Sequence, residues 1–496
     1  MHAFNDLKIE KSGDSLKITI LICVALAIGL YLIATTVVIA KDGVGYIEDA
    51  KDLAATGSLG SRVYGPGYPY MISAWYRVLG FVVMPDSLVG WTTAAQSVTL
   101  LCKIAAIIPL YFVGKLVVGA GKSFWAVLIL LILPAPAKYG SDVLREWPYI
   151  LFLGLGLLLL MLGSRRQNIW AFAGAGICAG VGQMIRPEAV LLMLVVGGWA
   201  VAVFAGLNQG TGKGKTALMA LAALAGFAIP SIFYVKVGGD LVAPQLRGLF
   251  AVCQMNRNLS HVSGHLQWVC AQTQTGVLES SWEVLEVIGQ TVNYVFVVPL
   301  LLGAAKSFRR GKDLLRDEWF FIWCLMGIYF GMLVLLHVTH GYVSSRHCLP
   351  MIAFAVFFVP VGGIDIAKWL HSKLNFASVR MYALFLLAAA IAVCLPRLFR
   401  PINFDKQQFL QAAEWLDENC PEDALIGVLD ARLGFYSSRQ WEVFVRDVPS
   451  DADYVAIEAK DYDRMENPSA RRVKTFSGDA EKEGVYVYKL RAEEGG

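Results

Sequence analysis

Eleven stretches of the chain are almost continuously apolar. A bilayer core about 30 Å thick is crossed by about 20 helical residues at about 1.5 Å each, so stretches of this length predict membrane spans. The predicted spans cover residues 17–40, 88–113, 123–138, 147–163, 168–185, 187–206, 216–236, 287–305, 318–337, 349–369 and 380–397. The pattern therefore predicts an α-helical polytopic membrane protein with about eleven transmembrane helices.

The composition agrees with a membrane protein. The 496-residue chain is 56% hydrophobic and only 17% charged, which is too apolar for a soluble domain to cover itself with polar surface. Its formal charge of +4 is unevenly distributed, because residues 400–496 carry 13 basic and 20 acidic residues (−7) and the first 399 carry the other 30 and 19 (+11). The basic excess lies in short loops, where it indicates membrane topology and not nucleic-acid binding.

Basic residues mark one side of the predicted bundle. Lysines precede the first span, and the loops on the same side hold Lys115 with Lys122, Arg165 with Arg166, Lys213 with Lys215, and Lys368 with Lys373. Cytoplasmic loops carry such an excess, so the N-terminus is expected in the cytoplasm. The other side then receives a first outer loop at 41–87, a long outer loop at 237–286 and the C-terminal tail.

The chain is expected to have two domains. Residues 1–399 form the transmembrane domain, and residues 400–496 form a small α/β domain on the extracytoplasmic side. Within the tail, residues 404–419 show helical spacing of apolar side chains, and four later segments have strand patterns. These strand segments are "ALIGVLD", "WEVFV", "DYVAIEA" and "GVYVYKL".

The first outer loop opens with the acidic tract "KDGVGYIEDAKD". Residues 45–55 place apolar side chains on one side and charged ones on the other, which predicts an amphipathic helix in the membrane interface. Asp49 is on the charged side, where a solvated position is favoured and a second active-site carboxylate is the alternative. Asp42, directly after the first span, is either a catalytic base or a charge that stops the span at the interface.

Ionisable residues recur at the span ends of the outer side. Besides Asp42 and Asp49, they are Arg62, Lys138, Asp142, Arg145, Glu146, Arg186, Glu188, Arg346 and His347. Folding can bring several of them around one cavity. There a carboxylate can remove a proton from an attacking hydroxyl or amine while arginines hold a phosphate leaving group. A lipid-phosphate substrate explains why such a site lies where hydrocarbon meets water.

Several tracts carry a resemblance to a known family. They are the Asp42 tract, "PGYPYMISAWY", "SDVLREWPYILFL", "GQMIRPEAVLLML", "SSRHCLPMIAF", and "AAEWLDENCPEDA" and "ARLGFYSSR" in the tail. In this order, over nearly the whole chain, they resemble the GT-C class of membrane glycosyltransferases, close to the bacterial aminoarabinose-transferase and protein O-mannosyltransferase branch. The sequence departs from the family where Gly43 replaces a frequent second acid and where His347 replaces a frequent Tyr.

The resemblance implies an inverting glycosyltransferase of the bacterial inner membrane with its site on the periplasmic side. Its donor would be a polyprenyl-phosphate-linked sugar, and its acceptor a lipid, glycan or protein. The resemblance implies Asp42 as general base, Asp142 or Glu146 as the second-loop acid, and Arg346 as the phosphate ligand. Further candidates for substrate binding are Arg145, Arg186, Asp49, Arg62 and His347. No cofactor is expected.

Simpler interpretations of these residues stay open. Arg186 precedes a proline at a turn and could anchor its helix by snorkelling. Arg145 lies between Asp142 and Glu146 and could form a local ion pair with either. Transport or lipid flipping is the alternative function, for which Lys103, deep in a predicted span, is the main sign, although no internal repeat accompanies it.

Histidines and cysteines add two predictions. His261 and His265 are four residues apart and could bind a divalent metal ion on one helix face, but no further ligand completes a set. Cys253 and Cys270 lie in the long outer loop, which faces an oxidising compartment, so a disulfide between them is predicted and two free thiols are the alternative.

Overall fold

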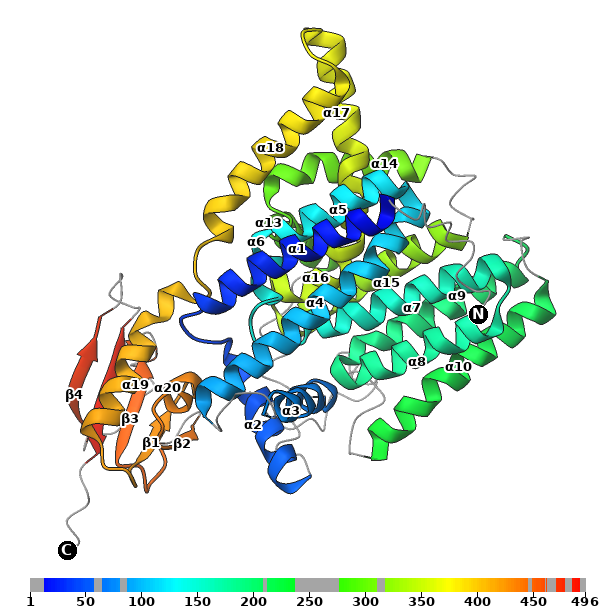
Figure 1. Cartoon of the computed structure of the whole chain (residues 1–496). Coiled ribbons are helices and arrows are strands. Elements are labelled where there is room, and N and C mark those ends of the chain that lie inside the picture. Colours follow the sequence, from blue (N-terminus) through cyan, green and yellow to red (C-terminus); the bar gives the residue numbers. More distant parts are fainter. Residues whose placement is uncertain are drawn as a thin grey trace, which may run out of the picture.

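The computed structural model describes residues 13–57, 65–80, 87–207, 212–236, 276–309, 317–444, 448–459, 461, 470–477 and 484–490. In this part of the chain, a bundle of long helices carries a small α/β domain at one end (Figure 1). The bundle contains α1 (Gly13–Ala34), α2 (Lys41–Thr56), α3 (Gly67–Gly80), α4 (Leu88–Val118), α5 (Ala120–Ile132), α6 (Pro134–Tyr139), α7 (Glu146–Arg166), α8 (Ile169–Ile185), the 3-10 helix η2 (Pro187–Val190), α9 (Leu191–Phe204), α10 (Lys213–Lys236), α13 (Val277–Thr291), η3 (Tyr294–Phe296), α14 (Val297–Arg309), α15 (Asp317–His340), α16 (Ser345–Ala355), η4 (Val356–Phe358), α17 (Val359–Leu374) and α18 (Val379–Leu398).

Within the described residues, eight helices are long and apolar enough to cross a membrane, and α5 and α8 are shorter apolar helices. The chain is therefore a multi-pass membrane protein, as predicted. The predicted span at 287–305 is not one continuous helix, because α13 and the helix formed by η3 and α14 meet at a bend of 102° within it. Asn293, at the break, has a φ of 56°, a left-handed conformation that Asn tolerates better than most residues.

The tail forms a five-stranded mixed sheet with two helices. Its elements are η5 (Phe404–Lys406), α19 (Gln407–Asn419), β1 (Leu425–Val428), α20 (Ala431–Phe435), β2 (Gln440–Val443), β3 (Tyr454–Glu458), β4 (Ala470–Phe476) and β5 (Val485–Leu490). The strand order is β2-β1-β3-β5-β4, with β1 parallel to β2 and β3, and β5 antiparallel to β3 and β4. The sequence pattern misses β4, an edge strand whose exposed Arg471, Arg472 and Lys474 hide any alternation. Charged side chains are usual on such edges because they discourage pairing with other chains.

The acid of the first outer loop does not end the first helix. α1 stops at Ala34, six residues form an irregular segment, and Asp42 lies in the first turn of α2. The predicted helix over residues 45–55 is confirmed as part of α2, and its place in the membrane interface stays a prediction. The favoured solvated position of Asp49 is wrong, because this side chain is only 2% exposed. α2 is enclosed because it packs against α3 and α4 of the bundle and against α20 of the tail (Figure 1).

The tail also holds the segment that leads into α2. Val38 is buried in the hydrophobic core of the tail, and its carbonyl oxygen accepts a hydrogen bond of 2.8 Å from Asn403 Nδ2. The backbone N–H of Ile39 donates to Tyr436 Oη at 3.0 Å. These contacts fix the chain three residues before Asp42, so the tail helps to set the position of the first turn of α2.

Candidate active site

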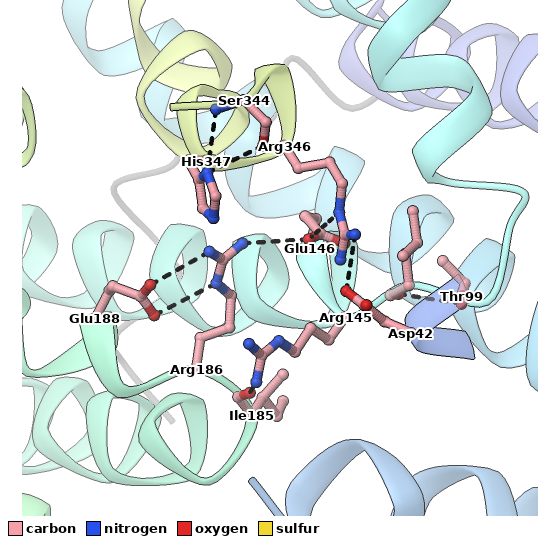
Figure 2. A network of polar contacts seen from close by, with 11 residues as sticks. Asp42, Thr99, Arg145, Glu146, Ile185, Arg186, Glu188, Ser344, Arg346 and His347 are labelled. Atoms are coloured by element: carbon pink, nitrogen blue, oxygen red, sulfur yellow. Dashed lines mark hydrogen bonds and ion pairs between the residues drawn. The ribbon is translucent and has the colours of Figure 1, made fainter. Parts of the chain in front are cut away.

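Five charged side chains form a continuous network at the tail-bearing end of the bundle (Figure 2). Arg346 Nη1 donates to Asp42 Oδ2 at 2.9 Å, and Arg346 Nε donates to Glu146 Oε1 at 3.1 Å. Arg186 Nη1 donates to the same Glu146 oxygen at 3.4 Å. The other side of Arg186 contacts both carboxylate oxygens of Glu188, at 3.4 and 3.3 Å. The signs alternate along the network from Glu188 to Asp42.

Most of these residues lie at or next to the N-terminus of a helix. Asp42, Glu146 and Arg346 stand in the first turns of α2, α7 and α16. Arg186 and Glu188 flank a proline that cannot continue α8 and that begins η2 instead. The N-terminus of a helix carries a partial positive charge, so three converging N-termini stabilise carboxylates here and favour an anionic ligand.

The network is buried at one end and open at the other. The side chains of Glu146, Arg186 and Glu188 are 2–5% exposed, whereas those of Arg346 and Asp42 are 27% and 38% exposed. A substrate that arrives from solvent or from the membrane interface therefore meets the Asp42–Arg346 pair first.

Some buried polar atoms beside the network have free hydrogen-bonding capacity. Glu146 Oε2 and the hydroxyl groups of Tyr149 and Tyr329 have no hydrogen-bond partner among the described residues. The guanidinium of Arg186 lies 5.8 Å from the centre of the Tyr149 ring. Because buried polar atoms normally have a partner, these atoms can bond to water or to a bound molecule.

Asp142 has a different environment from Glu146. Its Oδ1 accepts the backbone N–H of Ala40 at 2.9 Å and that of Val143 at 2.7 Å, so it ties the segment before α2 to the loop before α7. Burial raises the pKa of Asp142 to about 6, although these two backbone hydrogen bonds lower it. Of the two candidates for the second-loop acid, Glu146 is the one that shares Arg346 with Asp42.

Gly43 allows the close approach of α2 to this loop. A Cβ atom at this position would lie 2.9 Å from Val143 Cβ and 3.1 Å from the Val143 carbonyl oxygen. A second acid after Asp42, as is frequent in the resembling family, would need the loop at Val143 to move.

The structure also places the other predicted site residues. The side chain of Arg186 is buried and doubly ion-paired, so the simpler interpretation of a snorkelling anchor is wrong. Arg145 Nη1 donates to the carbonyl oxygen of Ile185 at 3.3 Å, next to the network. His347 Nδ1 accepts the backbone N–H of Ser344 at 3.2 Å and thereby caps α16.

Two contributors are not among the substrate-binding or catalytic residues predicted from the sequence. Glu188 completes the buried end of the network, and the sequence marks it only as one of the ionisable residues at the outer span ends. Tyr436 reaches the segment before α2 from the tail, a contact between residues almost 400 positions apart, which no local pattern reveals.

Three predicted site residues lie outside the described residues: Arg62, Cys253 and Cys270. The same holds for His261 and His265. Among the residues that the structure does describe, no group of three or more His, Cys, Asp or Glu side chains is placed to hold a metal ion. The predicted disulfide stays a prediction, and non-reducing peptide mapping that finds both thiols free would contradict it.

Comparison with solved structures identifies the fold. The chain is similar to the archaeal oligosaccharyltransferase AglB from Archaeoglobus fulgidus, solved in complex with an inhibitory peptide and a dolichol-phosphate, with a TM-score of 0.61 and 11% identity over 92% of this chain and 70% of that one. It is also similar to ArnT from Cupriavidus metallidurans bound to undecaprenyl phosphate, with a TM-score of 0.58 and 14% identity over 96% of this chain and 98% of that one. The chain has the fold of the GT-C superfamily.

The GT-C fold agrees with the resemblance drawn from the sequence tracts. The match to ArnT spans both the bundle and the tail, since it covers nearly all of both chains. No protein-family model matches the sequence, and neither does any curated protein. The likeness is therefore one of three-dimensional structure, and the function has to be argued from the site.

Proposed function

We propose that this protein is an inverting glycosyltransferase that uses a polyprenyl-phosphate-linked sugar. One observation carries the proposal: the Asp42–Arg346 ion pair of 2.9 Å is the open end of an otherwise buried charged network. A carboxylate and an arginine are the two groups that sugar transfer from a phosphate requires. The GT-C fold supports the same class of reaction.

Arg346 is proposed to hold the phosphate of the donor. Its guanidinium has a fixed orientation because Glu146 accepts a hydrogen bond from Nε, which leaves the Nη edge for a phosphate. The N-termini of α2, α7 and α16 add partial positive charge at the same place. Two solved GT-C structures, of AglB and ArnT, hold a dolichol-phosphate and an undecaprenyl phosphate, which supports a polyprenyl phosphate as the lipid carrier.

Asp42 is proposed as the general base. The acceptor hydroxyl or amine attacks the anomeric carbon while its proton passes to the Asp42 carboxylate. The bond between that carbon and the phosphate oxygen breaks, its electron pair leaves with the polyprenyl phosphate, and the configuration inverts. Arg346 Nη1 donates to Asp42 in the structure. The donor phosphate would accept this hydrogen bond instead, and the Asp42 carboxylate would then be free to accept the proton of the acceptor.

The proposed reaction occurs on the periplasmic side of a bacterial inner membrane. The basic loops of the sequence support this orientation, because they lie at the opposite end of the bundle. No metal or cofactor is assigned to the reaction. The acceptor belongs to one of three classes, which are lipid, glycan and protein.

The test uses wild-type and Asp42→Asn protein in proteoliposomes with polyprenyl-phosphate sugars labelled in the sugar and an envelope extract as acceptor. Loss of a general base typically lowers the rate 10²–10⁴-fold, so we expect transfer to fall by this factor while the donor still binds. Glu48→Gln is the matched control, because Glu48 is on the same helix and its side chain is similarly exposed, at 40%.

Wild-type turnover by the Asp42→Asn protein would overturn the assignment of the base. Transport or flipping, the alternative function, would move labelled lipid across the bilayer without forming a new covalent bond.

A further inference from the structure

A charged pocket lies at the opposite end of the bundle from the network. It has a volume of 210 Å³, lies between α5, α14 and α17 and is lined by Lys122, Lys306, Asp365 and Lys368, among others. Arg346 and Lys368 belong to one continuous run of helical residues, Ser345–Leu374. Twenty-two residues separate them, which is about 33 Å of axial rise. The pocket is therefore one bilayer thickness away from the charged network.

An apolar groove adjoins this pocket. It measures 670 Å³, runs between α5, α14, α17 and α18, and is lined by Trp125, Pro299, Pro360, Gly363 and Leu387, among others. Lys122 and Ile364 line both the pocket and the groove, so the two are contiguous. Figure 1 shows α17 and α18 as a hairpin that leaves the bundle beside α14, and residues of these three helices line the groove.

The charges of the pocket are not balanced. Lys306 Nζ contacts both oxygens of Asp365, at 2.6 and 2.7 Å, so this pair is neutral. Lys122 and Lys368 have no carboxylate partner among the described residues. As far as the described residues go, the pocket thus presents two uncompensated positive charges at the mouth of an apolar groove.

We propose that this site binds an anionic glycerophospholipid, with its phosphate between Lys122 and Lys368 and an acyl chain in the groove. Basic pockets between transmembrane helices are suited to acidic lipid head groups, and the apolar lining of the groove gives an acyl chain a surface for van der Waals packing. A zwitterionic lipid would bring an ammonium group to the same lysines and gain less. The site is independent of the proposed glycosyl transfer.

Glycine in the groove offers a direct test of the acyl-chain position. A Cβ atom added at Gly363 meets no heavy atom within 4 Å, so Gly363→Leu adds an apolar side chain to the groove lining without a clash at its Cβ. Lys122→Ala/Lys368→Ala removes the head-group charges. Lys213→Ala/Lys373→Ala is the matched control, because both residues are exposed lysines of the same predicted side that do not line the pocket.

The experiment titrates delipidated full-length protein in detergent with phosphatidylglycerol or with phosphatidylcholine and measures bound lipid by native mass spectrometry. At about 1 kcal/mol for each lysine near a membrane surface, loss of both lysines should weaken phosphatidylglycerol binding about 30-fold. Gly363→Leu should weaken the binding of both lipids, and the control should bind like wild type. Equal affinity for the two lipids in wild type, or an equal loss in the control, would overturn the proposal.

Discussion

At the scale of single residues, alternation of charge explains how ionised groups stay buried beside apolar spans. A lone buried charge is very costly, but each buried member of the network faces opposite charges. Glu146 is central because one of its oxygens accepts from both Arg186 and Arg346. It is therefore proposed as a positioning residue that orients Arg346 and keeps the two arginines from repelling each other.

Glu146→Gln should destabilise the protein and lower its activity together. The amide removes the charge between two guanidinium groups, and breaking a buried pair in this way typically costs about 3–5 kcal/mol. We expect a lower melting temperature in detergent and a clear loss of donor binding, measured with a labelled polyprenyl-phosphate sugar. An unchanged affinity for the donor would contradict the role assigned to Glu146.

Asp142→Asn, unlike Glu146→Gln, should stabilise the protein at neutral pH. Burial raises the pKa of Asp142 from 3.8 to about 6, so its ionisation is less favourable in the folded than in the unfolded state. The contribution of this carboxyl to stability is full below about pH 4 and is lost as the pH rises through about 6. Asparagine keeps the oxygen that accepts from Ala40 and Val143 but carries no charge.

We therefore expect the Asp142→Asn protein to match wild type near pH 4 and to be more stable at pH 7.5, by about 3 kcal/mol at most. Unfolding followed between pH 4 and 8 measures this difference. The variant should also keep most of the transfer activity. A loss as large as that of Asp42→Asn would instead identify Asp142 as the second-loop acid.

Arg346→Lys separates charge from geometry. Lysine keeps the positive charge but lacks the planar fork that contacts Asp42 and Glu146 at once. We expect donor affinity to fall in the lysine variant and to fall further in Arg346→Ala, as measured by competition with a polyprenyl phosphate. Arg77→Ala, which removes an exposed arginine of α3, is the control and should bind normally.

At the scale of secondary-structure elements, the tail helps to position the site although none of its described residues joins the charged network. Tyr436 follows α20, and its hydroxyl oxygen accepts a hydrogen bond from the backbone N–H of Ile39, three residues before Asp42. Tyr436→Phe leaves this N–H without its acceptor, and an unsatisfied buried donor costs about 1–3 kcal/mol. We expect kcat to fall more than the affinity for the donor, because the base moves while Arg346 stays in place.

Tyr382→Phe is the matched control for this prediction. The hydroxyl of Tyr382, on α18, has no hydrogen-bond partner among the described residues, so its removal should leave kcat unchanged. An equal effect of the two variants would show that the loss of kcat is not specific to the contact with Ile39.

Elements with a strong periodic pattern could be predicted from the sequence, and elements set by distant contacts could not. The apolar runs predict most of the long helices, and the apolar face of α19 predicts the tail helix, because burial on one side imposes a period. The same reasoning misplaces Asp49, since α2 packs against both the bundle and the tail, and Asp49 is buried although Glu48 on the same helix stays accessible. The bend at Asn293 is also invisible to a hydropathy pattern, because one residue in a left-handed conformation changes direction without changing composition.

At the scale of the whole molecule, the sequence supplied the members of the site but not their pairing. Asp42, Glu146 and Arg346 were all selected as ionisable residues at span ends, and the order of the tracts pointed to the GT-C fold. The sequence does not distinguish Asp142 from Glu146, because four residues of separation place both at the same helix end. Only the contacts distinguish a carboxylate that binds backbone N–H groups from one that binds arginines.

The orientation of the whole molecule in the membrane can be tested by labelling from one side. If basic loops are cytoplasmic, then the tail and the charged network face outward and the lysine pocket faces inward. Glu414, on α19, and Lys373, in the last turn of α17, are both exposed. In intact cells, a membrane-impermeant maleimide should label Glu414→Cys but not Lys373→Cys, and it should label both after the cells are permeabilised. The unmutated protein gives the background from its own cysteines. Labelling of Lys373→Cys alone in intact cells would show that the topology is the reverse of the one predicted, with the network facing the cytoplasm.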